Sequence, residues 1–180
     1  MTSFYDDIAA LARQIKLLAL DVDGVLTDGK LYFGNSGEEL KAFSTLDGLG
    51  IKLLQDSGVT VALITARNSA LVQLRAQNLG IQHVCQGSHN KLQSLTELLK
   101  TLGLALEQTA YVGDDLPDLA CLRQARLGIA VANAHDALKQ QATWVTTLAG
   151  GAGAVREVCD LILQAQGNYA AALAPFESGE

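Results

Sequence analysis

A regular alternation of short apolar runs with amphipathic segments is the feature that most limits how this chain can fold. The apolar runs have the length of β-strands and cover residues 16–21, 59–65, 83–87, 109–115, 127–133 and 143–147. The segments with helical spacing of apolar residues cover 47–58, 68–80, 89–103, 116–125, 134–142 and 153–167. Because the runs are apolar throughout, both faces of each strand must be covered, which is typical of a parallel sheet between two layers of helices. The sequence therefore predicts an α/β fold with a doubly wound, Rossmann-like parallel sheet.

The size of the chain fits one domain. It has 180 residues, of which 49% are apolar and 18% are charged, a composition typical of a globular protein with a sizeable core. We therefore expect residues 1–180 to form a single domain. We expect the final segment, residues 168–180, to be a flexible tail, because the ends of a chain are often held by few contacts.

The charge balance limits the classes of partner. The formal net charge is -6 and no basic stripe is present, which argues against binding to nucleic acid or to an acidic membrane surface. No apolar run approaches the roughly 20 residues that span a bilayer, and the first residues lack the apolar core of a signal peptide. The scattered cysteines, three in number, favour free thiols in a reducing compartment. We therefore expect a cytoplasmic protein that contacts neither nucleic acid nor membrane.

One segment departs from the alternation. Residues 30–43 contain two short strand-like pieces around Gly34-Asn35-Ser36-Gly37, a pattern that predicts a β-hairpin. This hairpin directly follows the first group of acidic residues. We therefore expect it to form a flap over whatever those acids bind.

Carboxylates stand at the ends of two of the predicted strands. Asp21 and Asp23 end the first strand, and Asp114 and Asp115 end the strand over 109–115. Residues two apart in an extended segment point the same way, so Asp21 and Asp23 can face one site. Ligands of a parallel sheet bind beyond the carboxyl ends of its strands, and carboxylates gathered there need a cation beside them. Oxygen ligands of this kind suit Mg²⁺.

Two further polar residues are expected at the same edge of the sheet. Thr65 ends the second strand, and Lys91 lies near the start of the helix that follows the third. The ordered set resembles the four-motif signature of the haloacid dehalogenase superfamily of phosphatases, with DVDGVLTDG from Asp21, IT ending at Thr65, then Lys91, and GDDLPD over 113–118. The resemblance extends over nearly the whole chain and implies that superfamily's version of the doubly wound fold.

The resemblance implies a chemistry for these positions. Asp21 would attack phosphorus and form an aspartyl-phosphate. Asp23 would protonate the leaving alcohol and then take a proton from the water that cleaves the intermediate. Thr65 and Lys91 would bind the phosphoryl oxygens and offset their charge.

The resemblance also implies a metal site. Mg²⁺ would be held by the Asp21 carboxylate, the main-chain carbonyl of Asp23 and the side chain of Asp114. Asp115 and Asp118 would support the water shell of the metal or the position of Lys91.

The resemblance is closer to one family within this superfamily. The spans 22–64 and 66–90 are too short for the cap domain that many relatives insert, so we expect an open, capless site. The chain resembles the 3-deoxy-D-manno-octulosonate 8-phosphate phosphatase family. The segments that carry this resemblance are LALDVDGVLTDGKLYFGNSGEELKAFSTLDGLGIKLL, ITAR, QGSHNK, GDDLPDL and GGAGAVREVCDLIL. This resemblance implies a Mg²⁺-dependent phosphoric monoester hydrolase of lipopolysaccharide biosynthesis. It also implies a homotetramer in which the hairpin flaps pack together.

The implied substrate, 3-deoxy-D-manno-octulosonate 8-phosphate, carries a carboxylate as well as a phosphate. Arg67 is a candidate for binding this carboxylate, because guanidinium groups bind carboxylates in a bidentate manner. The glycine-rich turn over 150–153, which precedes a helix, is another candidate anion site. Relatives often carry a basic residue where Ala152 stands. A nine-carbon keto-sugar acid phosphate, or a broad range of sugar phosphates, is therefore kept as an alternative substrate.

Two other classes of protein use similar residues. Residues 24–30 match the GxxxxGK pattern of nucleotide-binding kinases and ATPases, but Leu31 stands where a hydroxyl must bind Mg²⁺, and a hairpin follows instead of a helix. A receiver domain of signalling proteins also uses Asp, Thr, Lys and Mg²⁺, and would hold its phosphoryl group without turnover. Asp23, two residues after the nucleophile, and the late GDDLPD motif favour turnover. The receiver is the second alternative.

Overall fold

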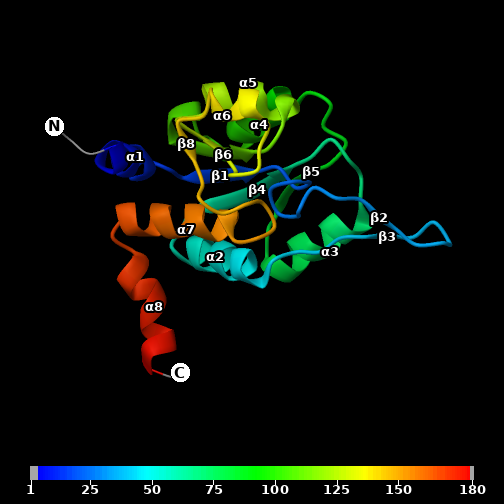
Figure 1. The fold of residues 1–180 in the computed structure, drawn as a ribbon. Helices are drawn as coiled ribbons and strands as arrows, with labels where there is room; N and C mark the ends of the chain where they lie inside the picture. Colours follow the sequence, from blue (N-terminus) through cyan, green and yellow to red (C-terminus); the bar gives the residue numbers. More distant parts are fainter. Residues whose placement is uncertain (1–3, 179–180) are drawn as a thin grey trace.

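The computed structural model describes residues 4–178, and at its centre lies one six-stranded sheet (Figure 1). The strands are β1 (Leu17–Leu20), β4 (Thr60–Ile64), β5 (His83–Cys85), β6 (Thr109–Gly113), β7 (Leu127–Ala130) and β8 (Trp144–Val145). They lie in the order β5-β4-β1-β6-β7-β8, and every neighbouring pair is parallel. The prediction of an α/β fold with a doubly wound parallel sheet is confirmed.

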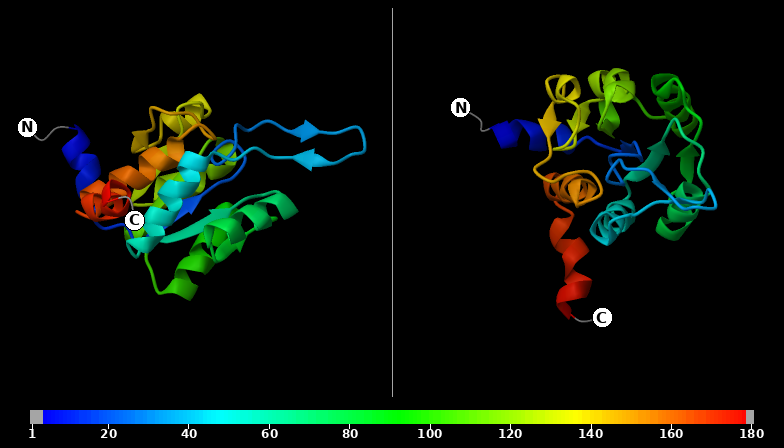
Figure 2. Two further views of the ribbon diagram at one scale, coloured as in Figure 1. Left: turned by 90° about the horizontal axis from the view of Figure 1, so that it is seen from below. Right: turned by 45° about the vertical axis from the view of Figure 1, so that its right-hand side comes forward.

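Helices cover both faces of this sheet (Figure 1 and Figure 2). One face carries α2 (Thr45–Asp56), α3 (Ala70–Leu79) and α7 (Ala154–Ala165). The other face carries α4 (Lys91–Leu102), α5 (Leu119–Gln124) and α6 (Asp136–Lys139). The remaining helical segments are α1 (Phe4–Ala12), which packs against α7, and two 3₁₀ turns over Leu106–Gln108 and Leu116–Asp118. Within residues 4–178, no helix is long and apolar enough to cross a membrane.

The central strand β1 is buried on every side. Leu17, Leu18 and Leu20 are fully buried, because β4 and β6 pair with both edges of the strand and helices cover both faces. Burying one such side chain contributes about 1.5–3 kcal/mol. β1 therefore carries the residues that follow it, beginning with Asp21, to a fixed position at the edge of the sheet.

Two predicted elements are reduced to less than half of their expected length. The helix expected over 134–142 is reduced to α6, and the strand expected over 143–147 is the two-residue β8. The Thr143 N–H donates to the Gly128 carbonyl at 2.8 Å, which draws the chain back to the sheet before the helix can continue. The helix expected over 116–125 begins as the 3₁₀ turn and continues as α5.

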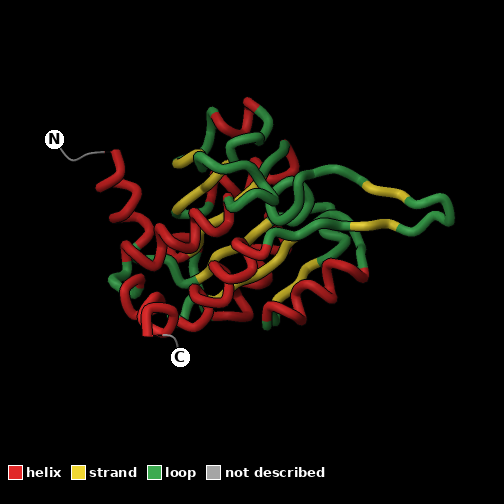
Figure 3. Tube along the Cα trace, turned by 60° about the horizontal axis from the view of Figure 1, so that its bottom comes forward, coloured by secondary structure: helices red, strands yellow, loops and turns green. Residues whose placement is uncertain are grey.

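The hairpin predicted for residues 30–43 projects from the body of the molecule (Figure 2 and Figure 3). Its strands β2 (Tyr32–Phe33) and β3 (Glu39–Leu40) pair in antiparallel orientation. The flap exposes large apolar side chains, namely Leu31, Tyr32, Phe33 and Leu40. Between β1 and β5 the chain forms only this flap, α2, β4 and α3, so the described residues contain no cap domain.

The last described element is the helix α8 (Tyr169–Ser178), which projects away from the sheet (Figure 1). It lies within the segment 168–180, for which a flexible tail was predicted. α8 contacts α7, and none of its residues is buried. The flexibility of this segment stays a prediction.

Asp47 joins α2 to the start of α7. This residue is 1% exposed and accepts a hydrogen bond from the Arg156 N–H in the first turn of α7, at 2.8 Å. The residue before α7 is Gly153, which has no side chain to cap the helix, so Asp47 supplies the acceptor from another element. The turn before α7 packs on the loop after β1, where the Gly151 N–H donates to the Val25 carbonyl at 2.9 Å. Asp47 therefore helps to fix the loop that carries the predicted catalytic acids.

We expect Asp47→Ala to lower the free energy of unfolding by about 1–2 kcal/mol, because the start of α7 loses its acceptor. Asp47→Asn retains an acceptor oxygen and should lose less. Asp56→Ala, at an exposed position of the same helix, is the control and should change stability by no more than about 0.5 kcal/mol. Urea unfolding of the three variants measures the difference. Equal effects at positions 47 and 56 would contradict the capping role.

Candidate active site

The carboxyl ends of three neighbouring strands bring the predicted residues together. Leu20 of β1 pairs with Leu63 of β4 and with Val112 of β6, so the residues just after these strands lie near one level. A cavity of about 270 Å³ opens at this edge. Its lining includes every residue predicted for the site, namely Asp21, Asp23, Thr65, Arg67, Lys91, Asp114, Asp115 and Asp118.

Lys91, at the start of α4, neutralises two buried carboxylates. Its Nζ lies 2.8 Å from Asp21 Oδ1 and 2.7 Å from Asp118 Oδ1. Asp21 is 5% exposed, Lys91 6% and Asp118 1%, and unpaired charges at this depth would be costly. Burial lowers the pKa of Lys91, but the carboxylates of Asp21 and Asp118 outweigh burial and hold that pKa above its usual value. The ammonium group is therefore kept charged beside Asp21.

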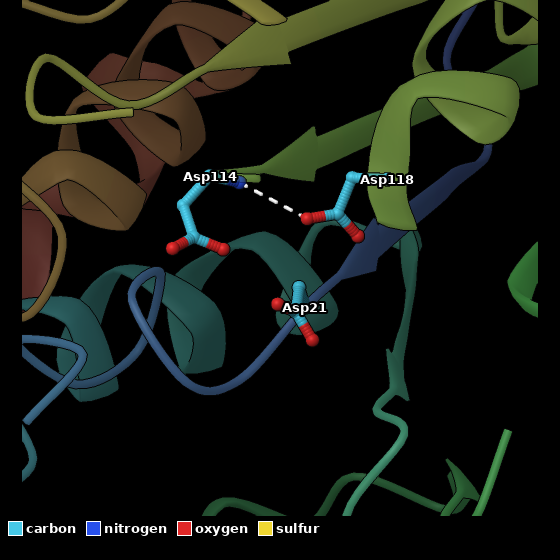
Figure 4. Close-up of side chains that lie close together, drawn as sticks. All are labelled: Asp21, Asp114 and Asp118. Atoms are coloured by element: carbon cyan, nitrogen blue, oxygen red, sulfur yellow. Dashed lines mark hydrogen bonds between the residues drawn. The ribbon is translucent and has the colours of Figure 1, made fainter. Parts of the chain in front are cut away.

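Asp118 receives hydrogen bonds on both of its carboxylate oxygens. Besides Lys91, the Tyr111 hydroxyl donates to Oδ1 at 2.7 Å. The Asp114 N–H donates to Oδ2 at 3.1 Å, as drawn in Figure 4, and the Asp115 N–H donates to the same oxygen at 3.3 Å. Because these donors use its acceptor sites, Asp118 is suited to holding Lys91 and the segment after β6 in place.

Asp21, Asp114 and Asp118 converge on one region (Figure 4). Each offers a carboxylate oxygen, and these oxygens all lie within 4.8 Å of one another. Gly24 has a φ of 97°, and a Cβ at this position would overlap the Asp114 carboxylate. The glycine of the DVDG segment is therefore required both by the turn and by the close approach of Asp114.

Crowding of these acids in a buried site changes their ionisation. Burial, and next the Asp118 carboxylate, raises the pKa of Asp21 to about 8, although Lys91 opposes the shift. Burial and Asp118 also raise the pKa of Asp114 to about 6. Carboxyl groups this close retain a proton near neutral pH unless a cation takes its place. An oxygen-only donor set of this kind fits a hard divalent cation such as Mg²⁺.

Asp23 faces the flap, where it takes part in a set of ion pairs. Its Oδ1 binds Lys41 Nζ, which also lies 3.4 Å from Glu39 Oε1. Arg67 donates from Nη2 to Glu39 Oε1 at 2.9 Å, and its Nε lies 3.9 Å from Asp23 Oδ2. Arg67, predicted to bind a carboxylate of the substrate, is thus paired here with carboxylates of the chain itself.

Lys41 and Tyr111 touch the site residues but were not identified from the sequence. Tyr111 lies within an apolar strand, where an aromatic residue indicates only core packing. Lys41 lies in the flap, and no local signal distinguishes it from Lys30, whose side chain is 73% exposed. The two lysines differ because the hairpin folds back so that Lys41, and not Lys30, contacts Asp23.

The remaining predicted residues keep free polar groups at the cavity. Thr65 is 2% exposed, and its hydroxyl accepts from the Arg67 N–H at 3.3 Å, which leaves the hydroxyl proton for another acceptor. Asp115 is exposed, and its Oδ1 accepts from the Leu116 N–H at 2.8 Å. The start of α7, considered above as an anion site, already holds the carboxylate of Asp47.

Known proteins resemble this chain along nearly its whole length. Residues 80–157 match the haloacid dehalogenase-like hydrolase family. The 3-deoxy-D-manno-octulosonate 8-phosphate phosphatase of Escherichia coli K12 is 53% identical over 161 residues, which cover 89% of this chain and 86% of that protein. The chain belongs to this family of phosphatases. The resemblance read from the four motifs is confirmed.

Solved structures of the family agree with the fold. The phosphatase of Moraxella catarrhalis, in complex with magnesium, phosphate and KDO, has a TM-score of 0.93 at 48% identity, covering 95% of this chain and 98% of that one. The cobalt-bound deoxy-D-mannose-octulosonate 8-phosphate phosphatase of Haemophilus influenzae has a TM-score of 0.85 at 42% identity, covering 88% and 93%.

The raised pKa of Asp21 predicts how the stability of the metal-free protein depends on pH. The folded-state pKa, about 8, lies above the usual 3.8, so the folded state binds more protons between these values. The free energy of unfolding should therefore fall as the pH rises through this window. Asp21→Asn removes the titrating group, so the variant should become increasingly more stable than the wild type as the pH rises.

Unfolding by urea with a chelator present, at several pH values, measures this difference. Asp7→Asn, at an exposed position of α1, is the control, and its difference from the wild type should stay constant. A difference between Asp21→Asn and the wild type that does not change with pH would contradict the assigned burial of Asp21.

Proposed function

We propose that this chain is a Mg²⁺-dependent phosphatase that hydrolyses 3-deoxy-D-manno-octulosonate 8-phosphate to the free sugar acid and phosphate, in lipopolysaccharide biosynthesis. The observation that carries the proposal is the placement of Asp21, buried and paired with Lys91, beside Asp114 in one cavity at the strand ends. The 53% identity to the Escherichia coli phosphatase of this name supports the choice of substrate.

Asp21 would act as the nucleophile. One of its carboxylate oxygens would attack phosphorus in line with the leaving alcohol and form an aspartyl-phosphate, which water then cleaves. Lys91 lies 2.8 Å from Asp21 Oδ1 and would stay beside the phosphoryl oxygens, offsetting their charge together with the Thr65 hydroxyl. Asp23 would protonate the leaving oxygen and then accept a proton from the attacking water.

Asp21, the main-chain carbonyl of Asp23 and Asp114 would hold Mg²⁺. When bound, the metal would supply positive charge that offsets the developing charge on the phosphoryl group. Asp118, which already holds Lys91, would keep that lysine in place. Asp115, exposed at the mouth of the cavity, would support the water shell of the metal. Arg67 would exchange its pairing with Glu39 for the carboxylate of the substrate.

Phosphate release from a panel of sugar phosphates tests the proposal. We expect activity with Mg²⁺ on 3-deoxy-D-manno-octulosonate 8-phosphate to exceed that on a nine-carbon keto-sugar acid phosphate and on simple sugar phosphates. A chelator should abolish it, and Asp21→Asn should lower kcat by at least about 10⁴-fold. Equal, slow hydrolysis of every ester would reject the substrate, and a stable phosphoryl adduct without turnover would favour a receiver.

We further propose that the protein forms a homotetramer through the flap. A two-stranded hairpin is only marginally stable by itself, and exposed apolar residues on one element mark an interaction surface. Phe33 is 66% exposed and Leu40 61% exposed on the projecting hairpin. Four flaps packed together would cover these side chains.

Light scattering after size-exclusion chromatography tests the assembly. We expect the wild type to have four times the mass of one chain, and Phe33→Ser with Leu40→Ser to yield smaller species because the packed apolar surface is lost. Leu74→Ser, at a position of α3 that is 54% exposed, is the control and should leave the mass unchanged. A monomeric wild type would refute the tetramer.

A cytoplasmic location is also part of the proposal. Cys85, Cys121 and Cys159 are free thiols, and Cys121 and Cys159 are buried. Free thiols of this kind are typical of proteins from a reducing compartment.

A further inference from the structure

The side chain of Lys41 is buried, and the described acidic residues with which it pairs belong to the site and to the flap. Its side chain is 2% exposed, whereas that of Lys30 on the other arm of the flap is 73% exposed. Burying an ammonium group is costly unless carboxylates pair with it, and Lys41 pairs with Asp23 and Glu39. The flap therefore inserts a positive charge next to the residue proposed as general acid.

Four charged side chains form a closed ring of alternating sign. Lys41 binds Asp23, Asp23 lies beside Arg67, Arg67 binds Glu39, and Glu39 lies beside Lys41. Glu39 and Lys41 come from the returning arm of the flap, while the other two members come from the loops after β1 and β4. Residues two apart in an extended segment point to the same side, which explains why Glu39 and Lys41 face the ring while Leu40 is 61% exposed.

The two oxygens of Asp23 have different surroundings. Oδ1 binds Lys41 Nζ. Oδ2 is buried and has no hydrogen-bond partner among the described residues, and Arg67 Nε lies 3.9 Å from it. A buried oxygen without a partner is costly, so this atom is suited to a group that arrives with the substrate. Asp23 lines the same cavity as Asp21, the residue that the ester would contact.

We propose that Lys41 is a positioning residue for Asp23: by occupying Oδ1 it leaves Oδ2 as the oxygen that carries the proton for the leaving group. This inference rests on the proposed phosphatase function. A side chain held at one oxygen by a buried ammonium cannot rotate freely, so the proton donor keeps one orientation toward the ester. Preorganisation of this kind is how a general acid gains efficiency.

The step that depends on Lys41 is the departure of the alcohol. A bond forms between an Asp21 carboxylate oxygen and phosphorus, and the bond between phosphorus and the leaving oxygen breaks. The proton on Asp23 Oδ2 passes to that oxygen, so the alcohol leaves neutral and Asp23 becomes a carboxylate. Lys41 keeps its protons and then neutralises the charge left on Asp23.

The effect of a Lys41 substitution on esters with different leaving groups distinguishes two roles. Lys41 either positions Asp23, as proposed, or acts only as an anchor that holds the flap in place. An alkyl phosphate has a poor leaving group that needs the proton, whereas p-nitrophenyl phosphate releases a stable anion without it. The ratio kcat/KM covers the steps up to departure of the leaving group. An anchor would affect both esters alike, and a positioning residue would affect mainly the alkyl ester.

The experiment compares kcat/KM of the Mg²⁺-loaded protein on 3-deoxy-D-manno-octulosonate 8-phosphate and on p-nitrophenyl phosphate. We expect Lys41→Met to lower the value for the sugar phosphate by about 10- to 100-fold and that for the aryl ester by less than about threefold. Asp23→Asn gives the reference pattern for loss of the acid. Lys30→Met, the matched lysine on the other arm of the flap, should leave both values unchanged.

Equal losses on the two esters, or no loss on either, would overturn the inference. Lys41→Gln, which fills the space and keeps an N–H donor, is measured beside Lys41→Met in case the latter does not fold. Because its amide can still occupy Oδ1, we expect a smaller loss, again mainly on the sugar phosphate. A wild type that hydrolyses neither ester would overturn the proposed function and this inference with it. An active wild type with equal losses in the variants overturns the inference alone.

Discussion

The buried ion pairs of Lys91 with Asp21 and Asp118 connect three parts of the chain that are far apart in sequence. Asp21 follows β1, Lys91 begins α4, and Asp118 ends the turn after β6. Each charge would be costly to bury alone, so the register of the sheet, the start of α4 and the turn after β6 must be correct together. The Tyr111 hydroxyl and two main-chain N–H groups complete the partners of Asp118. The site is therefore specified by the same contacts that complete this edge of the fold.

The loop after β1 is also held by close contacts at glycines. Gly24 admits the Asp114 carboxylate, and the glycines before α7 lie against the backbone of this loop, so close approach replaces side-chain packing. Asp47 fixes the start of α7 and through it the same turn. Asp21 is thus placed between a network of charges and a network of backbone contacts. Burial raises the pKa of Asp21 to about 8, so its charge is unfavourable in the absence of a metal. Both networks are therefore needed to hold Asp21 in place.

Much of this arrangement could be predicted from the sequence. Uniformly apolar runs require a parallel sheet covered on both faces, and acids at the ends of such runs must meet at one edge. The parts that could not be predicted depend on contacts between distant segments. From local sequence alone, Asp47 is an ordinary acidic residue in the first turn of α2. Tyr111 would be assigned to the core, and Lys41 would be a solvated charge on a hairpin. α6 is shorter than its pattern because Thr143 bonds to β7, a contact that no local periodicity contains.

The flap has a charged face and an apolar face, because successive residues of an extended segment point to opposite sides. On the returning arm, Glu39 and Lys41 point to Asp23 and Arg67, while Leu40 between them is 61% exposed. A shift of one residue in the pairing of β2 with β3 would exchange these two faces. The proposed assembly would fix this register by burying the apolar face, and the register in turn places Lys41 on Asp23. A capless phosphatase with an open site would therefore depend on its neighbours for the position of its proposed general acid, through Leu40 and Lys41 on the returning arm of the flap.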